Sequence, residues 1–263
     1  MIDSETTQQL TKLKILLIGD SCIDEYKIGT VDRLSPEAPV PVIKLISEYS
    51  VPGMAANVKQ NLEQLNIDLD FVTNNDIILK TRYIDKRSGQ HLLRVDTEPK
   101  ITPWDNQIQD INIYDAIVIS DYNKGFLTYE NIEQIITSTH KPIFIDTKKT
   151  DLSRFSADWV YIKINETEYK NRQSNPKNLI VTLGGDGAKL HRDQKEVHFL
   201  TKEVGVVDVC GCGDTFLSAL TYSYLMTKNI ESAIIFANQA ASITVQHQGN
   251  YAPNLEEINN ARY

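Results

Sequence analysis

The sequence has few cysteines, no long apolar run and no excess of positive charge. Its 263 residues include three cysteines, an odd number, and Cys210 and Cys212 have no histidine at metal-ligand spacing. This argues against a disulfide framework or a zinc site and favours reduced thiols in the cytoplasm. No apolar run approaches the length of a membrane span, and the acidic start Met1–Glu5 lacks a signal-peptide pattern.

The net charge of −8 argues against nucleic acid or an anionic membrane surface as the main partner. A phosphate site in such a chain must be built locally, from backbone amides and a few lysines and arginines. Hydrophobic content of 41% and charged content of 24% are ordinary for a globular protein. The length fits one large α/β domain, so we expect residues 1–263 to form a single domain.

Short apolar runs alternate with helical patterns along the chain, which indicates βαβ units and a mostly parallel sheet. The runs typical of buried strands are Lys12–Gly19, Ala116–Ser120, Pro142–Asp146 and Leu179–Leu183. The expected helices are Gly53–Leu65, Tyr129–Ser138, about Asp214–Thr227 and Ser232–Gln246. Ligands of such folds bind at the carboxyl ends of the strands, so the residues that follow each strand are candidates for chemistry.

Two segments break this rhythm. Val31–Glu48 has three prolines and an alternating apolar tail, and Thr81–Glu98 is typical of a hairpin around Ser88-Gly89. Together they could form a small separate sheet, a lid of residues 31–48 and 81–98 over a pocket. The alternative is two ordinary edge hairpins.

The stretch Asp208–Thr215 (DVCGCGDT) is the most informative part of the chain. Its glycines, Gly211 and Gly213, allow close backbone approach, and with Cys212 they open a helix whose free N–H groups would form an anion hole. Asp214 beside that hole suits phosphoryl transfer to a hydroxyl, whose proton the carboxylate would accept. The alternative is an aspartate that only caps the helix.

Two other turns are candidates for cofactor binding. Asn165 and Glu168 lie three residues apart after an apolar run and could hold Mg²⁺ through its waters. The alternative is a capping box. The turn Thr182–Gly187 (TLGGDG) could admit nucleotide phosphates or could be a tight β-turn.

Carboxylates also follow strands. Asp20 and Asp24 come just after the first predicted strand, where a carboxylate can accept hydrogen bonds from two sugar hydroxyls or only satisfy a loop. Asp121 follows a later strand in the same way. Lys148 and Lys149 are either a phosphate contact or a solvated charge pair, and the sequence favours the pair.

Ten short segments, in order along the chain, resemble those of the ribokinase-like carbohydrate kinases, and within that family those of the heptose 7-phosphate kinase branch. The matching pieces are GDSCIDEY (Gly19–Tyr26), RLSPEAPVPV (Arg33–Val42), PGMAANV (Pro52–Val58), RVD (Arg94–Asp96), SDYNKG (Ser120–Gly125), IDTKKTD (Ile145–Asp151), NETE (Asn165–Glu168), TLGGDG (Thr182–Gly187), DVCGCGDT (Asp208–Thr215) and FANQAA (Phe236–Ala241). RLSPEAPVPV and SDYNKG point to the heptose branch.

The resemblance implies a three-layer ribokinase-like fold with a mostly parallel sheet and a small β lid. The length of the chain leads us to expect no nucleotidyltransferase domain beside it. It implies Asp214 as catalytic base and an anion hole at Gly211, Cys212 and Gly213. The remaining site residues that it implies are Thr182, Gly184, Gly187 and Asn238 for ATP, Asn165 and Glu168 for Mg²⁺ through water, and Asp24, Gly53, Asn57 and Lys124 for the sugar. A monovalent cation is a further candidate cofactor. The lid segments would present an exposed sheet edge that a second subunit can cover, so we expect a homodimer through the lid.

The implied reaction is ATP-dependent phosphorylation of D-glycero-β-D-manno-heptose 7-phosphate at the anomeric hydroxyl, giving the 1,7-bisphosphate, a precursor of ADP-heptose. The alternatives are a kinase for another sugar and a non-catalytic sugar- or nucleotide-binding homologue. The chain departs from the family at Met54, where a second glycine is usual, at Cys210 and Cys212, and in two shortened regions, Phe71–Tyr83 and Glu168–Leu179. The candidates for binding the sugar phosphate are Arg33, Arg87, Arg94, Lys124 and Lys148.

Overall fold

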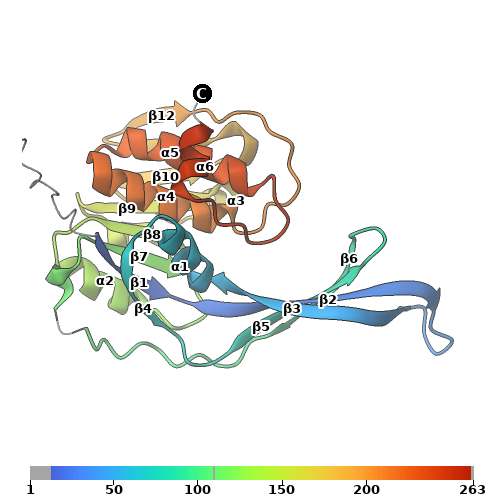
Figure 1. Cartoon of the computed structure of the whole chain (residues 1–263). Coiled ribbons are helices and arrows are strands. Elements are labelled where there is room, and N and C mark those ends of the chain that lie inside the picture. Colours follow the sequence, from blue (N-terminus) through green and yellow to red (C-terminus); the bar gives the residue numbers. More distant parts are fainter. Residues whose placement is uncertain (1–12, 109, 262–263) are drawn as a thin grey trace, which may run out of the picture.

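The computed structural model describes residues 13–108 and 110–261, and its centre is an eight-stranded sheet (Figure 1). The strands are β1 (Lys14–Gly19), β4 (Asp68–Thr73), β7 (Ala116–Asp121), β8 (Ile143–Thr147), β9 (Val160–Asn165), β10 (Asn178–Thr182), β11 (Ala188–Arg192) and β12 (Lys195–Phe199). Their order is β12-β11-β10-β9-β8-β7-β1-β4. All neighbours from β10 to β4 are parallel, and β11 pairs antiparallel with both β10 and β12. The expected mostly parallel sheet is confirmed.

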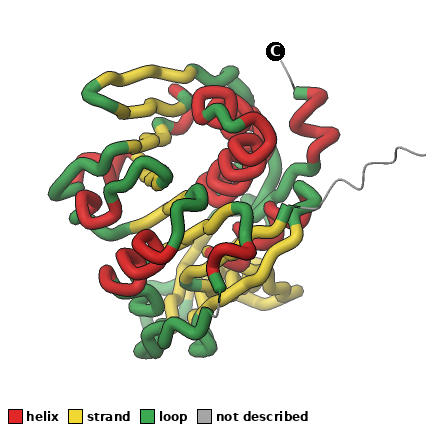
Figure 2. Tube along the Cα trace, turned by 90° about the vertical axis from the view of Figure 1, so that its left-hand side faces the viewer, coloured by secondary structure: helices red, strands yellow, loops and turns green. Residues whose placement is uncertain are grey.

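Helices cover both faces of this sheet, which makes three layers (Figure 2). One face carries α1 (Ala55–Gln64), α4 (Cys212–Thr227), α5 (Ile230–Thr244) and α6 (Leu255–Asn260). The other carries α2 (Tyr129–Ser138) and the short turns η1 (Ile111–Ile113) and η2 (Leu152–Phe155), and α3 (Glu166–Asn171) follows β9. In the part of the chain that the structure describes, no helix is both long and apolar enough to cross a membrane.

The central strands are apolar at nearly every position because both of their faces are buried. In β1, Ile15 and Leu17 enter the core under α4 and α5, while Leu16 and Ile18 enter the core under α2. The predicted strands and helices are found, with ends that shift by a few residues. Lys12, the first residue of the predicted first strand, lies outside the described residues. The sequence did not predict β4, β11, β12 or α6.

A second sheet of four strands projects from the body as a long arm (Figure 1). Its strands are β2 (Ser21–Leu34), β3 (Pro41–Met54), β5 (Ile78–Asp85) and β6 (His91–Thr97), in the order β3-β2-β5-β6. The separate small sheet predicted around residues 31–48 and 81–98 is therefore confirmed, but its strands begin nearer to the body. As a result Asp24 lies within β2, so the alternative in which it only satisfies a loop is wrong.

The arm joins the body where β3 runs directly into α1. Met54 at this junction has a φ of 57°, a conformation that favours glycine. Its side chain is buried in the core under α2, together with Cys22 and Ile78. Burial of this side chain offsets the strained backbone. Met54 therefore anchors the arm to the body.

Candidate active site

The predicted anion hole lies at the start of α4. Gly211 is the N-cap residue, with a φ of 73°, and Asp214 is the third residue of the helix. The alternative in which Asp214 caps the helix is therefore wrong. A Cβ atom at position 211 would lie 2.8 Å from Asn57 Nδ2 and 3.0 Å from Asn250 Oδ1, so glycine is needed for space as well. The first N–H groups of a helix have no intrahelical partner and can bind an anion.

Two side chains orient the buried carboxylate of Asp214. Asn57 Nδ2 donates to Oδ2 at 2.8 Å, and the Tyr122 hydroxyl donates to Oδ1 at 3.0 Å. Burial raises the pKa of Asp214 to about 6, with a smaller contribution from the charge of Asp146. The hydrogen bonds from Asn57 and Tyr122 act in the opposite direction. The carboxylate is thus fixed in position and suited to accept a proton near neutral pH.

A polar cavity of about 200 Å³ lies beside Asp214. Its walls include the anion-hole glycines, the amide side chain of Asn165 and several charged side chains: Asp121, Asp146, Lys148, Lys163 and Glu168. Asn165 and Glu168, predicted as the Mg²⁺ residues, are thus brought to the same cavity as Asp214. The sequence did not single out Tyr122 or Lys163, whereas Asp146 was among the residues at strand ends that are candidates for chemistry.

Asn165 and Glu168 also form the capping box that was the alternative interpretation. Asn165 Oδ1 accepts from the Glu168 backbone N–H at 2.9 Å, and Glu168 Oε2 accepts from the Asn165 backbone N–H at 2.8 Å. Lys148 Nζ donates to Glu168 Oε1 at 2.6 Å. Among the described residues there is no cluster of three His, Cys, Asp or Glu side chains that could hold a metal. The pair fits Mg²⁺ held through its waters and does not fit a metal cage made of protein ligands.

The two adjacent lysines after β8 have different environments. Lys148 is partly exposed and pairs with Glu168. Lys149 is buried, and its Nζ donates to Asp121 Oδ2 at 2.9 Å, Asn123 Oδ1 at 3.2 Å and the Leu127 carbonyl at 2.9 Å. The prediction of a solvated charge pair is therefore wrong for Lys149, which is a buried structural cation.

A second buried ion pair, which the sequence did not predict, lies under the anion hole. Lys163 Nζ donates to Asp146 Oδ2 at 2.6 Å, and the two residues are in register on β9 and β8. Burial alone would lower the pKa of Lys163, but the charge and hydrogen bond of Asp146 raise it above its ordinary value. The available sequence signal was a lysine within the apolar run Val160–Ile164.

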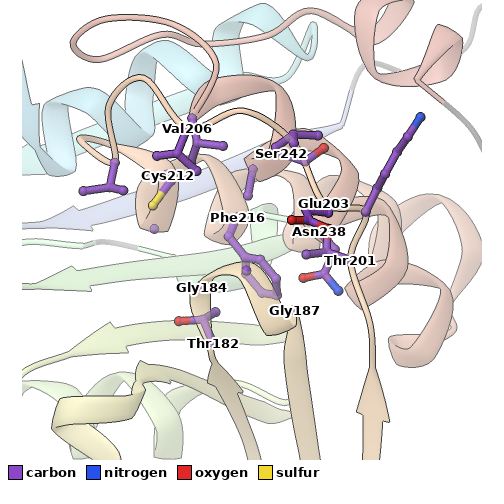
Figure 3. Close-up of a pocket in the computed structure, with 17 residues that line it drawn as sticks. Thr182, Gly184, Gly187, Thr201, Glu203, Val206, Cys212, Phe216, Asn238 and Ser242 are labelled. Carbon is purple, nitrogen blue, oxygen red and sulfur yellow. The ribbon is translucent and has the colours of Figure 1, made fainter.

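The predicted ATP residues line a larger cavity, of about 390 Å³ (Figure 3). Thr182, Gly184, Gly187 and Asn238 all border it, and Asn238 Nδ2 donates to the Phe199 carbonyl at 3.0 Å. Its other walls include Val206, Phe216 and Val245. Gly213 borders both this cavity and the polar one, so the two meet at the anion hole.

The predicted sugar residues lie where the arm meets the body. Asp24 Oδ1 pairs with Arg82 Nη1 at 2.5 Å, and both side chains are about 10% exposed. A Cβ atom on Gly53 would lie 2.2 Å from Asp24 Oδ2, so Gly53 makes room for this carboxylate. Arg82 lies over the ring of Tyr26, 5.3 Å from its centre. No motif in the sequence singled out Arg82.

Lys124, also predicted to bind the sugar, pairs instead with Glu98, just beyond β6, at 2.6 Å. No hydrogen bond among the described residues joins it to Asp24, Asn57 or Asp214. Of the predicted phosphate-binding cations, Arg87 pairs with exposed Asp32 on the arm. Arg94 pairs with Asp96 and lies in register with Arg82.

Comparison with known proteins places this geometry in a family. The model of the pfkB family carbohydrate kinases matches residues 53–257, more than half of the chain. The curated relative "Bifunctional protein HldE" from Sulfurimonas denitrificans is 30% identical over 302 residues, which cover 93% of this chain and 63% of that protein. The chain thus spans somewhat less than two thirds of the length of this relative.

Solved structures agree on the fold. A ribokinase from Thermotoga maritima has a TM-score of 0.73 at 20% identity, with 95% of this chain and 99% of that chain covered. A ribokinase from Arabidopsis thaliana, solved with ribose and ATP, has a TM-score of 0.71 at 15% identity, with coverages of 95% and 98%. The fold is ribokinase-like. The chain therefore belongs to the pfkB family of carbohydrate kinases and is an ATP-dependent sugar kinase.

Proposed function

We propose that this kinase phosphorylates D-glycero-β-D-manno-heptose 7-phosphate at its anomeric hydroxyl and gives the 1,7-bisphosphate. The observation that carries the chemistry is the buried Asp214 carboxylate at the mouth of α4, with one oxygen held by Asn57 and the other by Tyr122. The choice of heptose is supported by the RLSPEAPVPV and SDYNKG segments and by the similarity to HldE.

In the proposed reaction, Asp214 accepts the proton of the sugar hydroxyl as its oxygen attacks the γ-phosphorus. With a pKa of about 6, the carboxylate is mostly deprotonated at neutral pH and still able to take a proton. Backbone N–H groups of Gly211, Cys212 and Gly213 are placed to stabilise the charge of the migrating phosphoryl group. A pure binding protein would not need a buried base at this position.

We assign ATP to the larger cavity, since its apolar walls suit a base and it meets the polar cavity at Gly213. Asn165 and Glu168 would hold Mg²⁺ through its waters, and the ion would neutralise phosphate charge. Both oxygens of Glu168 already accept one hydrogen bond, but each keeps a lone pair for a water ligand. A monovalent cation stays a prediction.

We place the sugar against Asp24, Gly53 and Asn57, between the arm and the anion hole. For its 7-phosphate we favour Arg82 and Arg94, which lie in register on β5 and β6. Arg33 and Arg87 are exposed, and Arg87 already pairs with Asp32. Lys124 would contribute only if its bond to Glu98 opened.

We also propose that two chains pair through their arms over the two active sites. The four-stranded sheet and the turn between β2 and β3 expose many large apolar side chains, including Leu34, Val40, Leu45, Ile46, Tyr49, Leu93 and Val95. A projecting sheet with an apolar surface and open edges is stabilised when a second copy covers it.

The three cysteines form no disulfide, which supports a reducing compartment such as the cytoplasm.

The test is ADP release with a panel of sugars, with Asp214→Asn as the inactive control. The parent protein should turn over the heptose 7-phosphate, and the same heptose without its phosphate should be a poor substrate. Equal turnover of the unphosphorylated heptose would remove the phosphate site and favour a kinase for another sugar. Nucleotide binding without turnover of any sugar would favour a binding homologue.

A further inference from the structure

Two buried lysines near the site differ in the number of hydrogen bonds that their ammonium groups make. An ammonium group has three N–H donors. Lys149, with 3% of its side chain exposed, uses three acceptors, from Asp121, Asn123 and Leu127. Lys163, with 5% exposed, makes a single hydrogen bond in the described structure, to Asp146. A buried cation with unused donors is costly unless a ligand uses them.

The unused donors of Lys163 lie at the anion hole. A Cβ atom built on Gly213 would lie 3.0 Å from Lys163 Nζ, so the ammonium group lies against the first turn of α4, where a side chain at position 213 would crowd it. Lys163 lines the polar cavity together with Asp214 and Gly213. It lies on the same face of β9 as Tyr161, which packs in the core under α4, while Ile162 and Ile164 enter the opposite core.

The charges around the cavity show why a cation is needed there. Four carboxylates line it, those of Asp121, Asp146, Glu168 and Asp214. Lys149 neutralises Asp121, and Lys148 neutralises Glu168. Without Lys163, both remaining carboxylates would repel a phosphoryl group that has to lie beside them. With Lys163, only Asp214 is left without a cation.

We propose that Lys163 is a catalytic residue whose ammonium group binds the γ-phosphoryl group during its transfer, with Asp146 as its positioning partner. The proposal rests on the kinase reaction proposed above. The sugar oxygen forms the new bond to phosphorus, the bond between phosphorus and the bridging oxygen breaks, and its electron pair leaves with ADP. The hydroxyl proton goes to Asp214, and Lys163 keeps its own proton throughout. Its charge adds to the anion-hole amides as a preorganised stabiliser.

The experiment compares binding of ATP, ADP and AMP by calorimetry in the parent protein and in Lys163→Met. A charge-assisted bond contributes about 1.5–3 kcal/mol, or roughly 10- to 150-fold in affinity. We expect ATP to bind about 10-fold or more weakly, ADP to lose less, and AMP to bind as in the parent. The turnover number should fall with any sugar that the parent accepts, while the sugar KM stays within about twofold.

Lys149→Met/Asp121→Asn is the matched control, because it removes a buried lysine charge together with the cavity carboxylate that this lysine neutralises. It should lower the melting temperature and leave the ratio of ATP to AMP affinity unchanged. Lys163→Met leaves the Asp146 carboxylate buried without its cation. The double variant Lys163→Met/Asp146→Asn therefore tests the loss of the lysine without leaving an uncompensated buried charge.

Equal ATP affinity in the parent and in a folded Lys163 variant would overturn the proposal, as would weaker ATP binding with an unchanged turnover number. The nucleotide comparison needs no sugar. If the parent turns over no heptose 7-phosphate, the substrate assignment fails, while the ATP-to-ADP comparison still decides whether Lys163 contacts the γ-phosphate.

Discussion

Replacing Tyr122 by phenylalanine should move the acid limb of the pH–rate profile to higher pH. The Tyr122 hydroxyl donates to Asp214 Oδ1 at 3.0 Å. Burial is the main cause that raises the pKa of Asp214 to about 6, and the Tyr122 bond opposes it by stabilising the charged form. Phenylalanine keeps the ring, and with it the contacts with Lys80 and Lys148 over its face. Only the hydroxyl is lost, so the pKa of Asp214 must rise.

The size of the shift follows from the value of that one bond. A hydrogen bond to a charged group contributes about 1.5–3 kcal/mol, and one pKa unit corresponds to about 1.4 kcal/mol. Since the Asn57 bond to the other oxygen remains, we expect the lower end, a rise of about one unit. A base must be deprotonated to act, so near pH 6 the variant should be about fivefold slower than the parent, with little difference above about pH 8.

The assay is kcat/KM across the pH range from about 5 to 9. Tyr114→Phe is the matched control, because the Tyr114 hydroxyl also donates to an aspartate, Asp70, at 2.7 Å, at the β4 edge of the sheet. Tyr114→Phe should leave the acid limb where it is in the parent. An unmoved acid limb in Tyr122→Phe, or an equal shift in both variants, would refute the assignment of Asp214 as the titrating base.

Three further predictions concern neighbouring residues. Asp214→Asn should lower turnover by about 10²–10⁴. The folded protein binds the Asp214 proton more tightly than the unfolded chain does, so this carboxylate lowers the free energy of unfolding as the pH rises from about 4 to 6. The variant should therefore gain up to about 3 kcal/mol in the free energy of unfolding, measured with urea at pH 8. Glu168→Gln should raise the Mg²⁺ concentration needed for half-maximal turnover several-fold, and an unchanged Mg²⁺ titration would leave only the capping role. Gly53→Ala would put a methyl group 2.2 Å from Asp24 Oδ2, so calorimetry should show weaker sugar binding with ATP binding kept, and unchanged sugar affinity would exclude Asp24 from the site.

The parts of the fold that the sequence predicted are those specified by local patterns. β1, β7 and β8 read as buried strands because their residues are apolar on both faces. The β11–β12 hairpin was not predicted, and its turn residues Asp193 and Gln194 have positive φ without a glycine to signal the turn. A hairpin of mixed polarity with no turn signature gives little to recognise.

The same distinction holds for the site. Asp214 and the anion hole could be predicted because the helix start and its glycines are contiguous in the chain. Arg82 and Lys163 could not, since each meets its aspartate only through strand placement: Lys163 faces Asp146 across β8 and β9, and Arg82 lies on the strand paired with β2. Such contacts depend on register, which a single sequence does not specify.

In this protein, the number of hydrogen bonds that a buried cation makes distinguishes structural cations from functional ones. A buried ion pair is weak evidence for stability, because the cost of desolvation can exceed the attraction between the charges. Lys149 meets that cost with three acceptors and contributes to the fold. Among the residues that the structure describes, Lys163 has one acceptor, and Arg82, which has five donors, donates through Nη1 alone, to Asp24 and at 3.5 Å to the Lys80 carbonyl. Both cations therefore keep unused N–H donors beside a proposed phosphate position. Lys163 lies beside the one proposed for the γ-phosphate of ATP, and Arg82 beside the one proposed for the phosphate of the sugar. The unused hydrogen-bond donors of these two cations are therefore what the γ-phosphate of ATP and the phosphate of the sugar would engage.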